Sequence, residues 1–167
     1  MIKKFLLIAL VALPFGAFAQ ESQKIAYVNY QEVISVMPEV KAMNDSLQKS
    51  ANEFQAEFKV IQDEYTNKMS DYVNKQDSLN ESIKQRRMKE IQDLQQRAQT
   101  FQETAAQKQD ELQQKLILPI REKLQKAINE VGKENNFLYI VNGEAFLYVS
   151  PTAIDATPLI KKKLGIQ

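Results

Sequence analysis

The sequence contains no cysteine, no histidine, no tryptophan and only 4 glycines among its 167 residues. Without cysteine the chain has no disulfide, no thiolate nucleophile and no cysteine for lipoprotein attachment. Without histidine it has no imidazole base and none of the usual zinc sites. The glycine-rich motifs that bind phosphate groups do not occur either. We therefore expect a protein that uses no metal or cofactor and is not an enzyme.

The first 19 residues have the pattern of an export signal. Lys3 and Lys4 form a short basic region, Phe5–Val11 is an apolar core, and Ala17-Phe18-Ala19 fits a cleavage site. The apolar run is about 15 residues long, shorter than the roughly 20 that span a bilayer. A retained membrane anchor is the alternative. We expect cleavage and release into the periplasm, and the loss of both lysines leaves 20 basic residues against 21 acidic ones, a net charge of −1.

A long helical tract follows, from about residue 38 to residue 133. Its apolar residues recur at alternating intervals of three and four, which keeps one stripe of a helix against a partner helix. The stripe consists of Leu47, Ala51, Phe54, Phe58, Ile61, Tyr65, Met69 and Tyr72, and then of Ile91, Leu94, Ala98, Phe101, Ala105, Lys108 and Leu112. We expect the other side of each helix to be solvated.

The stripe is interrupted between residues 75 and 81. There Ser78 and Glu81 form a capping box that can start a new helix. We predict an antiparallel hairpin that turns near residues 76–81, with arms roughly 60 Å long at 1.5 Å per residue. A single uninterrupted helix is the alternative. Pro119 is expected to kink the returning helix.

Residues 20–37 and 134–167 are expected to form a β-rich body at the base of this arm. Strands are predicted at 24–29, at 137–141 and at 145–149, and Asn142-Gly143 favours a type I′ turn between the last two. A final helix is expected to be capped by Thr157, with Pro158 in its first turn, and to be closed by Gly165. Its three lysines suit the negative end of the helix dipole.

The predicted strands are apolar on both faces, with Phe137, Tyr139 and Val141 on one and Leu138 and Ile140 on the other. Strands of this kind need cover on both sides. A body of about 50 residues is marginal for a self-sufficient core. We therefore expect burial against further copies of the chain. The expected oligomer interface comprises Ile25, Tyr27, Phe137, Tyr139, Ile140, Phe146 and Tyr148.

The order of these parts resembles the Skp/OmpH family of periplasmic chaperones. The resemblance rests on the signal, the strand at 24–29, the Gln/Lys/Glu-rich hairpin, and the closing segments 136–141 and 152–157. It implies a mostly α-helical trimer in which a small β-barrel body joins three helical hairpins around a cavity. The family holds unfolded outer-membrane β-barrel proteins there without ATP. Family members are often strongly basic, whereas this chain carries a net charge of −1 once the signal is removed.

Two groups of arm residues are candidates for binding. The candidate client-binding residues are Phe54, Phe58, Tyr65, Met69, Tyr72, Ile91, Leu94 and Phe101. Whether this stripe packs inside the hairpin or contacts a client is left open. The basic cluster Lys84, Arg86, Arg87 and Lys89 follows the turn and could contact anionic lipid or client. A solvated helix face is the alternative for that cluster.

The leading functional hypothesis is an ATP-independent holdase chaperone whose partners are unfolded outer-membrane proteins and copies of itself. A structural coiled-coil adaptor or spacer of the cell envelope is the alternative. A regular Leu/Ile seam would favour the adaptor, whereas this seam is aromatic and interrupted by polar residues. Nucleic-acid binding is not expected, because the chain is exported and has no positive net charge.

Overall fold

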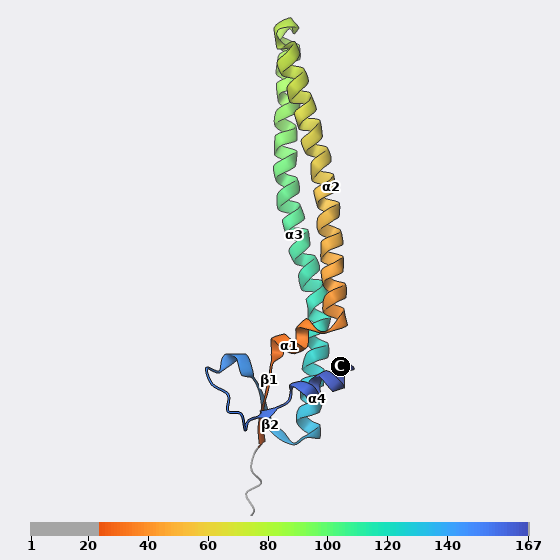
Figure 1. The fold of residues 1–167 in the computed structure, drawn as a ribbon. Coiled ribbons are helices and arrows are strands. Elements are labelled where there is room, and N and C mark those ends of the chain that lie inside the picture. Colours follow the sequence, from red (N-terminus) through yellow and green to blue (C-terminus); the bar gives the residue numbers. More distant parts are fainter. Residues whose placement is uncertain (1–23, 167) are drawn as a thin grey trace, which may run out of the picture.

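The computed structural model describes residues 24–166, in which a long two-helix arm projects from a small body (Figure 1). The predicted signal, residues 1–19, lies outside the described residues. The elements are β1 (Lys24–Val28), α1 (Tyr30–Ser35), α2 (Pro38–Lys75), the 3₁₀ turn η1 (Gln76–Ser78), α3 (Glu81–Glu134), β2 (Phe137–Asn142), the 3₁₀ turn η2 (Gly143–Ala145), β3 (Ile154–Asp155) and α4 (Thr157–Leu164). Across residues 24–166, no helix is both long enough and apolar enough to cross a bilayer.

The predicted helical hairpin is confirmed, and the single-helix alternative is excluded. The helix α3 begins after Asn80, whose side-chain oxygen accepts a hydrogen bond of 3.0 Å from the backbone N–H of Ile83. The predicted capping box is wrong, because the Ser78 hydroxyl donates to the carbonyl of Lys75 instead. Serine and asparagine are equally good helix caps, so it is the path of the backbone through η1 that makes Asn80 rather than Ser78 the cap of α3. Pro119 lies inside α3 without ending it.

The strand β1 is the centre of a three-stranded sheet with the order β2-β1-β3, and both pairings are parallel. The register with β2 shifts by one residue, which leaves Leu138 as the extra residue of a β-bulge. The bulge breaks the simple alternation predicted for this strand. Phe137 and Ile140 both pack against the core, whereas Leu138 is 45% and Tyr139 60% exposed.

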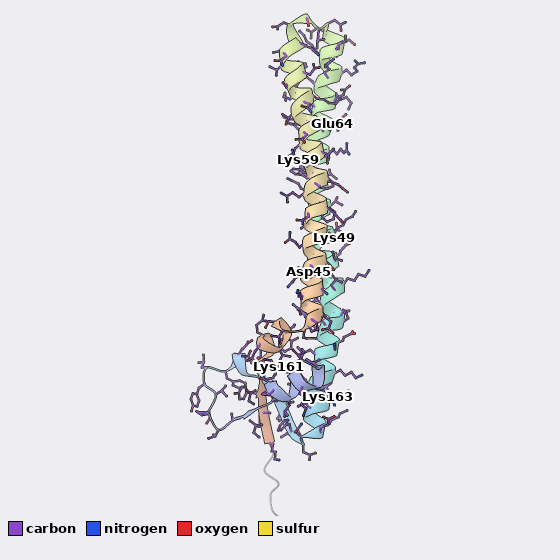
Figure 2. The ribbon with its side chains drawn as sticks, turned by 45° about the vertical axis from the view of Figure 1, so that its right-hand side comes forward. Asp45, Lys49, Lys59, Glu64, Lys161 and Lys163 are labelled. Atoms are coloured by element: carbon purple, nitrogen blue, oxygen red, sulfur yellow. The ribbon has the colours of Figure 1, made fainter. Side chains whose placement is uncertain are left out.

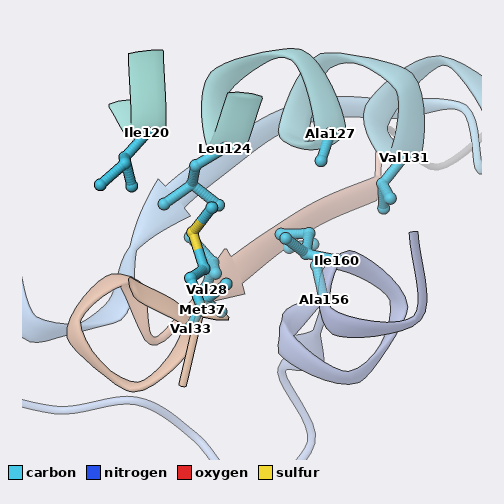
Figure 3. Packing of buried hydrophobic residues seen from close by; sticks show 10 residues of the cluster. Val28, Val33, Met37, Ile120, Leu124, Ala127, Val131, Ala156 and Ile160 are labelled. Atoms are coloured by element: carbon cyan, nitrogen blue, oxygen red, sulfur yellow. The ribbon is translucent and has the colours of Figure 1, made fainter. Parts of the chain in front are cut away.

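The core lies where one face of the sheet meets α1, α4 and the last turns of α3 (Figure 3). Its buried members are Ala26, Val28, Val33, Met37, Ile120, Leu124, Ala127, Val131, Ala156 and Ile160. The part of α3 that follows Pro119 thus packs on the sheet. The end of β1 is tied to α4, because the backbone N–H of Asn29 donates to the buried Thr157 hydroxyl at 2.9 Å.

The predicted β-hairpin at Asn142-Gly143 is wrong. A type I′ turn requires positive φ at both central positions, but Gly165 is the one glycine with positive φ in the described part of the chain. Gly143 is needed for a close approach instead, since a Cβ there would lie 2.8 Å from the Tyr27 ring. The Asn142 side chain accepts a hydrogen bond from the N–H of Glu144 and starts η2. Residues 146–149 therefore do not pair with β2.

The helix α4 ends at Gly165 as predicted, with φ of 73°. The predicted cap is wrong, because Thr157 is the first residue of the helix and its hydroxyl accepts from the N–H of Asn29 instead. The lysines lie at the negative end of the helix dipole, as expected, and two of them also form ion pairs with other helices of the body. Lys161 pairs with Glu32 of α1 at 2.5 Å, and Lys163 pairs with Glu130 of α3 at 3.3 Å. Figure 2 shows both lysines on the body. These pairs hold α4 over the core.

We expect Leu124→Ala to lower the free energy of unfolding by about 2–5 kcal/mol, because it leaves a cavity in a fully buried site. Leu118→Ala is the matched control in the same helix, since Leu118 is 59% exposed. We expect the control to change stability by less than about 0.5 kcal/mol. Urea unfolding followed by circular dichroism at fixed chain concentration measures both. Equal losses in the two variants would contradict the described core.

Candidate functional site

The seam between α2 and α3 is narrow, because only two helices contribute to it. Ile61, Ile91 and Leu94 are buried in its distal half, with 4%, 2% and 6% of their surface exposed. Nearer the body the seam is aromatic. The Phe101 ring lies edge-to-face with Phe54 at 6.2 Å between centroids and stacks on Phe58 at 6.3 Å. Each such pair stabilises the arm by about 0.5–1.5 kcal/mol beyond area burial.

All eight candidate client-binding residues lie along this seam. Ile91 and Leu94 are buried, so within one chain their role is packing. The other six are half-buried: Phe54, Phe58, Tyr65, Met69, Tyr72 and Phe101. A half-buried side chain touches the neighbouring helix with one side and water with the other. These six can hold the hairpin together and still offer surface to another chain.

Two grooves flank the aromatic part of the seam. The first, of about 510 Å³, contains Phe54 and Phe101 together with charged residues, among them Glu57, Asp93 and Lys108. The second, of about 400 Å³, is called here the glutamine groove. It is lined by Phe58, Ile61, Gln62, Tyr65, Gln95, Ala98, Gln99 and Gln102, and none of these is charged. The α3 residues of the two grooves fall on opposite sides of that helix, as its period of 3.6 residues requires.

Polar residues also enter the seam. Gln109 is half-buried and donates a hydrogen bond of 3.0 Å to the backbone carbonyl of Leu47 on the facing helix. Lys108, which the spacing places in the seam, is exposed instead. The seam thus shifts by one residue between Ala105 and Leu112. A glutamine bonded across the hairpin favours one register, because any slip would leave the amide unpaired.

The distal arm carries many charges that compensate one another (Figure 2). Every basic residue between positions 59 and 97 forms an ion pair within the arm. The pairs are Lys59–Asp63 (2.9 Å), Lys68–Glu90 (2.9 Å), Lys75–Asp71, Lys84–Glu81 (3.0 Å), Arg86–Glu90 (3.9 Å), Arg87–Asp71, Lys89–Asp93 (3.6 Å) and Arg97–Glu64 (3.8 Å). Three of them, through Asp71, Glu90 and Glu64, join α2 to α3. These bridges fix the register of the hairpin near its tip.

The predicted basic cluster lies in the first turns of α3. Arg86 and Lys89 are highly exposed, with 71% and 76% of their side-chain surface open to solvent. Each of the four cations lies beside a carboxylate, but two of these carboxylates also pair with Lys68 and Lys75, so the positive charge there is only partly compensated. Contact of this cluster with anionic lipid stays a prediction.

The ion pairs shift the titration of their members. Hydrogen bonds from Lys75 and Arg87 hold the pKa of the Asp71 carboxyl below its usual value. The hydrogen bond from Lys68 lowers the pKa of Glu90 in the same way. These carboxylates therefore stay charged in moderately acidic solution.

The body exposes a second apolar surface. Ile25 pairs with Tyr139 in the sheet, and the two lie on the face away from the core, 53% and 60% exposed. Beyond η2, Phe146, Leu147 and Tyr148 follow one another and are all exposed, Leu147 completely. Of the predicted interface residues, Tyr27 is half-buried, and Phe137 and Ile140 pack against the core of their own chain. Exposed contiguous apolar surface marks sites of interaction.

A comparison with protein-family models matches residues 24–164 to the family described as outer membrane protein (OmpH-like). The chain belongs to this OmpH-like family. The match runs from the first residue of β1 to the last residue of α4, so it includes the body and the arm. No curated protein matches the chain. The OmpH-like family is a family of periplasmic chaperones, not of enzymes.

The glutamine groove of the OmpH-like arm is lined by amide and apolar side chains. Within residues 24–166, no cluster of carboxylates is arranged to hold a metal ion. The glutamines of the groove were not anticipated as site residues, because exposed glutamine is common along this helix and carries no signal of its own. Only the pairing of α2 with α3 brings Gln62 together with Gln95 and Gln99.

We expect acid to weaken the OmpH-like arm through Asp71 and Glu90. Their pKa values are depressed in the folded chain. Their ion pairs therefore add stability above the usual carboxylate range, and this contribution is lost as the pH falls through the folded pKa values. The temperature at the midpoint of thermal unfolding, measured by circular dichroism, should decrease as the pH is lowered from about 7 to about 3.

Asp71→Asn should lower the midpoint at neutral pH and reduce the further fall in acid. The control is Asp45→Asn, since Asp45 is exposed and forms no ion pair in the described part of the chain. The control should follow the wild type at every pH. An equal acid-induced fall in Asp71→Asn and wild type would show that these pairs do not stabilise the arm.

Proposed function

We propose that the chain is an ATP-independent periplasmic holdase that binds unfolded outer-membrane β-barrel proteins between the helical arms of a homotrimer. The export signal in residues 1–19 belongs to this proposal, since it would deliver the chain to the compartment of its clients. Membership of the OmpH-like family supports it. The observation that carries it is the arm itself: a hairpin roughly 60 Å long at 1.5 Å per residue, with half-exposed aromatic residues along its seam.

The nature of the arm surface fits this activity. An unfolded barrel protein exposes apolar strands that aggregate when they meet each other. Half-buried rings and methionine offer adaptable apolar contacts, each weak by itself. Many weak contacts along a long arm hold a client without imposing one conformation. Release then needs no chemical energy, because each contact can break separately.

The exposed surface of the body supports assembly with further copies. A single chain leaves Ile25, Tyr139 and the segment 146–148 open to water. Burial of this surface between copies would place the arms side by side and create a space between them. One arm alone is too narrow to enclose a client, so the proposed activity depends on this assembly.

We expect the exported chain, residues 20–167, to suppress aggregation of a urea-unfolded outer-membrane barrel protein on dilution. The measurement is light scattering, followed by size-exclusion chromatography to detect the complex. Suppression should be complete near one trimer per client, because the cavity encloses one chain. Added ATP should change nothing. An assembled protein that leaves the client to aggregate would refute the holdase proposal and favour the envelope adaptor.

We expect Tyr139→Asp to convert the assembly to monomers, because it places a charge in the exposed apolar face of the sheet. Tyr139 suits the test better than Ile140, which packs in the core of its own chain. Gln31→Asp is the matched control, an exposed body residue of α1. Multi-angle light scattering gives the mass of each. A Tyr139→Asp protein that keeps the mass of the wild type would place the interface elsewhere.

A further inference from the structure

The glutamine groove differs in its chemistry from the groove on the other side of the seam. Its apolar lining is Phe58, Ile61, Tyr65 and Ala98, and the remainder is glutamine. The groove on the other side of the seam carries Glu57, Asp93 and Lys108 at comparable volume. The helices around the groove are rich in charged residues, so the absence of charge in its lining indicates what kind of ligand it can bind.

The four glutamines leave hydrogen-bonding groups free toward the groove. Gln95 donates to the Tyr65 hydroxyl at 3.0 Å, and Gln99 donates to Glu103 at 3.1 Å, so the amide oxygens of both remain as acceptors. Gln62 and Gln102 form no hydrogen bond with other side chains or backbone in the described residues. Each therefore offers both a donor and an acceptor. An extended chain that lies on an apolar surface needs both an acceptor for its peptide N–H groups and a donor for its carbonyl groups.

Electrostatics narrows the ligand further. The neighbouring cations Lys59 and Arg97 are held in ion pairs with Asp63 and Glu64. An acidic segment would find no unpaired cation here and would lose hydration on entry. A basic segment would meet only Glu103, which forms no ion pair in the described residues but already accepts the hydrogen bond from Gln99. An uncharged segment has no charged side chains whose hydration would be lost. The charge of the groove thus matches a neutral ligand.

The dimensions set the length of that segment. Phe58 and Tyr65 are seven residues apart on α2, roughly 10 Å along the helix. An extended chain covers this distance with about three residues at 3.3 Å each. The groove therefore takes a short stretch, and its affinity for that stretch is modest. Modest affinity suits one contact among many on a long arm.

We propose that the glutamine groove binds uncharged, extended stretches of an unfolded polypeptide, with apolar side chains on Phe58 and Tyr65 and peptide groups bonded to the glutamines. This inference rests on the holdase function proposed above and specifies which part of a client the arm recognises. Recognition here is by apolar contact and amide hydrogen bonds. Binding at the groove is consequently insensitive to salt.

The test uses a fluorescein-labelled peptide of alternating valine and threonine, and two derivatives in which threonines are replaced by glutamate or by lysine. Fluorescence anisotropy with the exported chain gives affinities at about 0.01 M and about 1 M salt, where the Debye length falls from about 30 Å to about 3 Å. We expect the neutral peptide to bind best and to weaken by less than about twofold in high salt. If the neutral peptide no longer binds in high salt, or if a charged peptide binds more tightly than the neutral one, the proposal is overturned.

The double variant Gln95→Glu/Gln99→Glu places two negative charges in the uncharged groove with almost no change of shape, so an apolar segment that enters must desolvate them. We expect it to weaken neutral-peptide binding about tenfold, equivalent to about 1.4 kcal/mol. The matched control is Gln92→Glu/Gln113→Glu, exposed residues of α3 outside the groove lining. The control should stay within about twofold of the wild type. Equal weakening in both variants would attribute the effect to net charge and overturn the proposal.

Two further results separate this inference from the holdase function. If the groove variant suppresses aggregation of the barrel protein as well as the wild type does, the function stands and the groove is not its site. If the wild type fails to suppress aggregation at any salt concentration, the holdase function itself is wrong. A groove variant that loses its oligomeric mass would assign the groove to a second copy of the chain and overturn the peptide proposal.

Discussion

The parallel pairing of β1 with β2 is the constraint on which the rest of the molecule depends. β1 precedes α2 and β2 follows α3, so this pairing holds the two ends of the hairpin in one body. The core beneath the sheet takes Val33 from α1 and Met37 from the residue before α2, and it takes Leu124 and Val131 from the end of α3. The arm has only a thin seam of its own. Without the anchored base, its two helices would rely on half-exposed contacts and surface ion pairs of small net value.

The body and the arm differ in how completely their apolar residues are buried. Residues of the body core are excluded from water almost completely, and Leu124 and Ile160 are 0% exposed. Along the arm, most apolar residues keep one side in water. A two-helix arm cannot avoid this, because burying a side chain completely takes neighbours on every side. The geometry that limits packing in the arm thus also leaves open the surface that we propose for client binding.

The arm could be predicted from the sequence, and much of the body could not. Alternating intervals of three and four define α2 and α3 locally, and their interruption locates the turn. The apolar run at 145–149 has the pattern of a strand, but nothing local records that Gly143 lies under the Tyr27 ring or that Leu138 bulges. The helix α1, with six residues, was too short to show a period. The glutamine groove exists only because two distant stretches face each other, so no local pattern could reveal it.

Under the export proposed above, the chain order has a consequence for how the protein folds. β1 belongs to the first part of the chain to emerge from a translocation channel, yet both of its partners lie at the far end, β2 about 110 residues later. The helices of the arm can meet through neighbouring contacts as they emerge, whereas the sheet has high contact order and must wait for the last segment. Until then β1 is an unsatisfied edge, open to pairing with any extended chain nearby. On this proposal, emergence from the N-terminal end delays formation of the body until the last segment has left the channel.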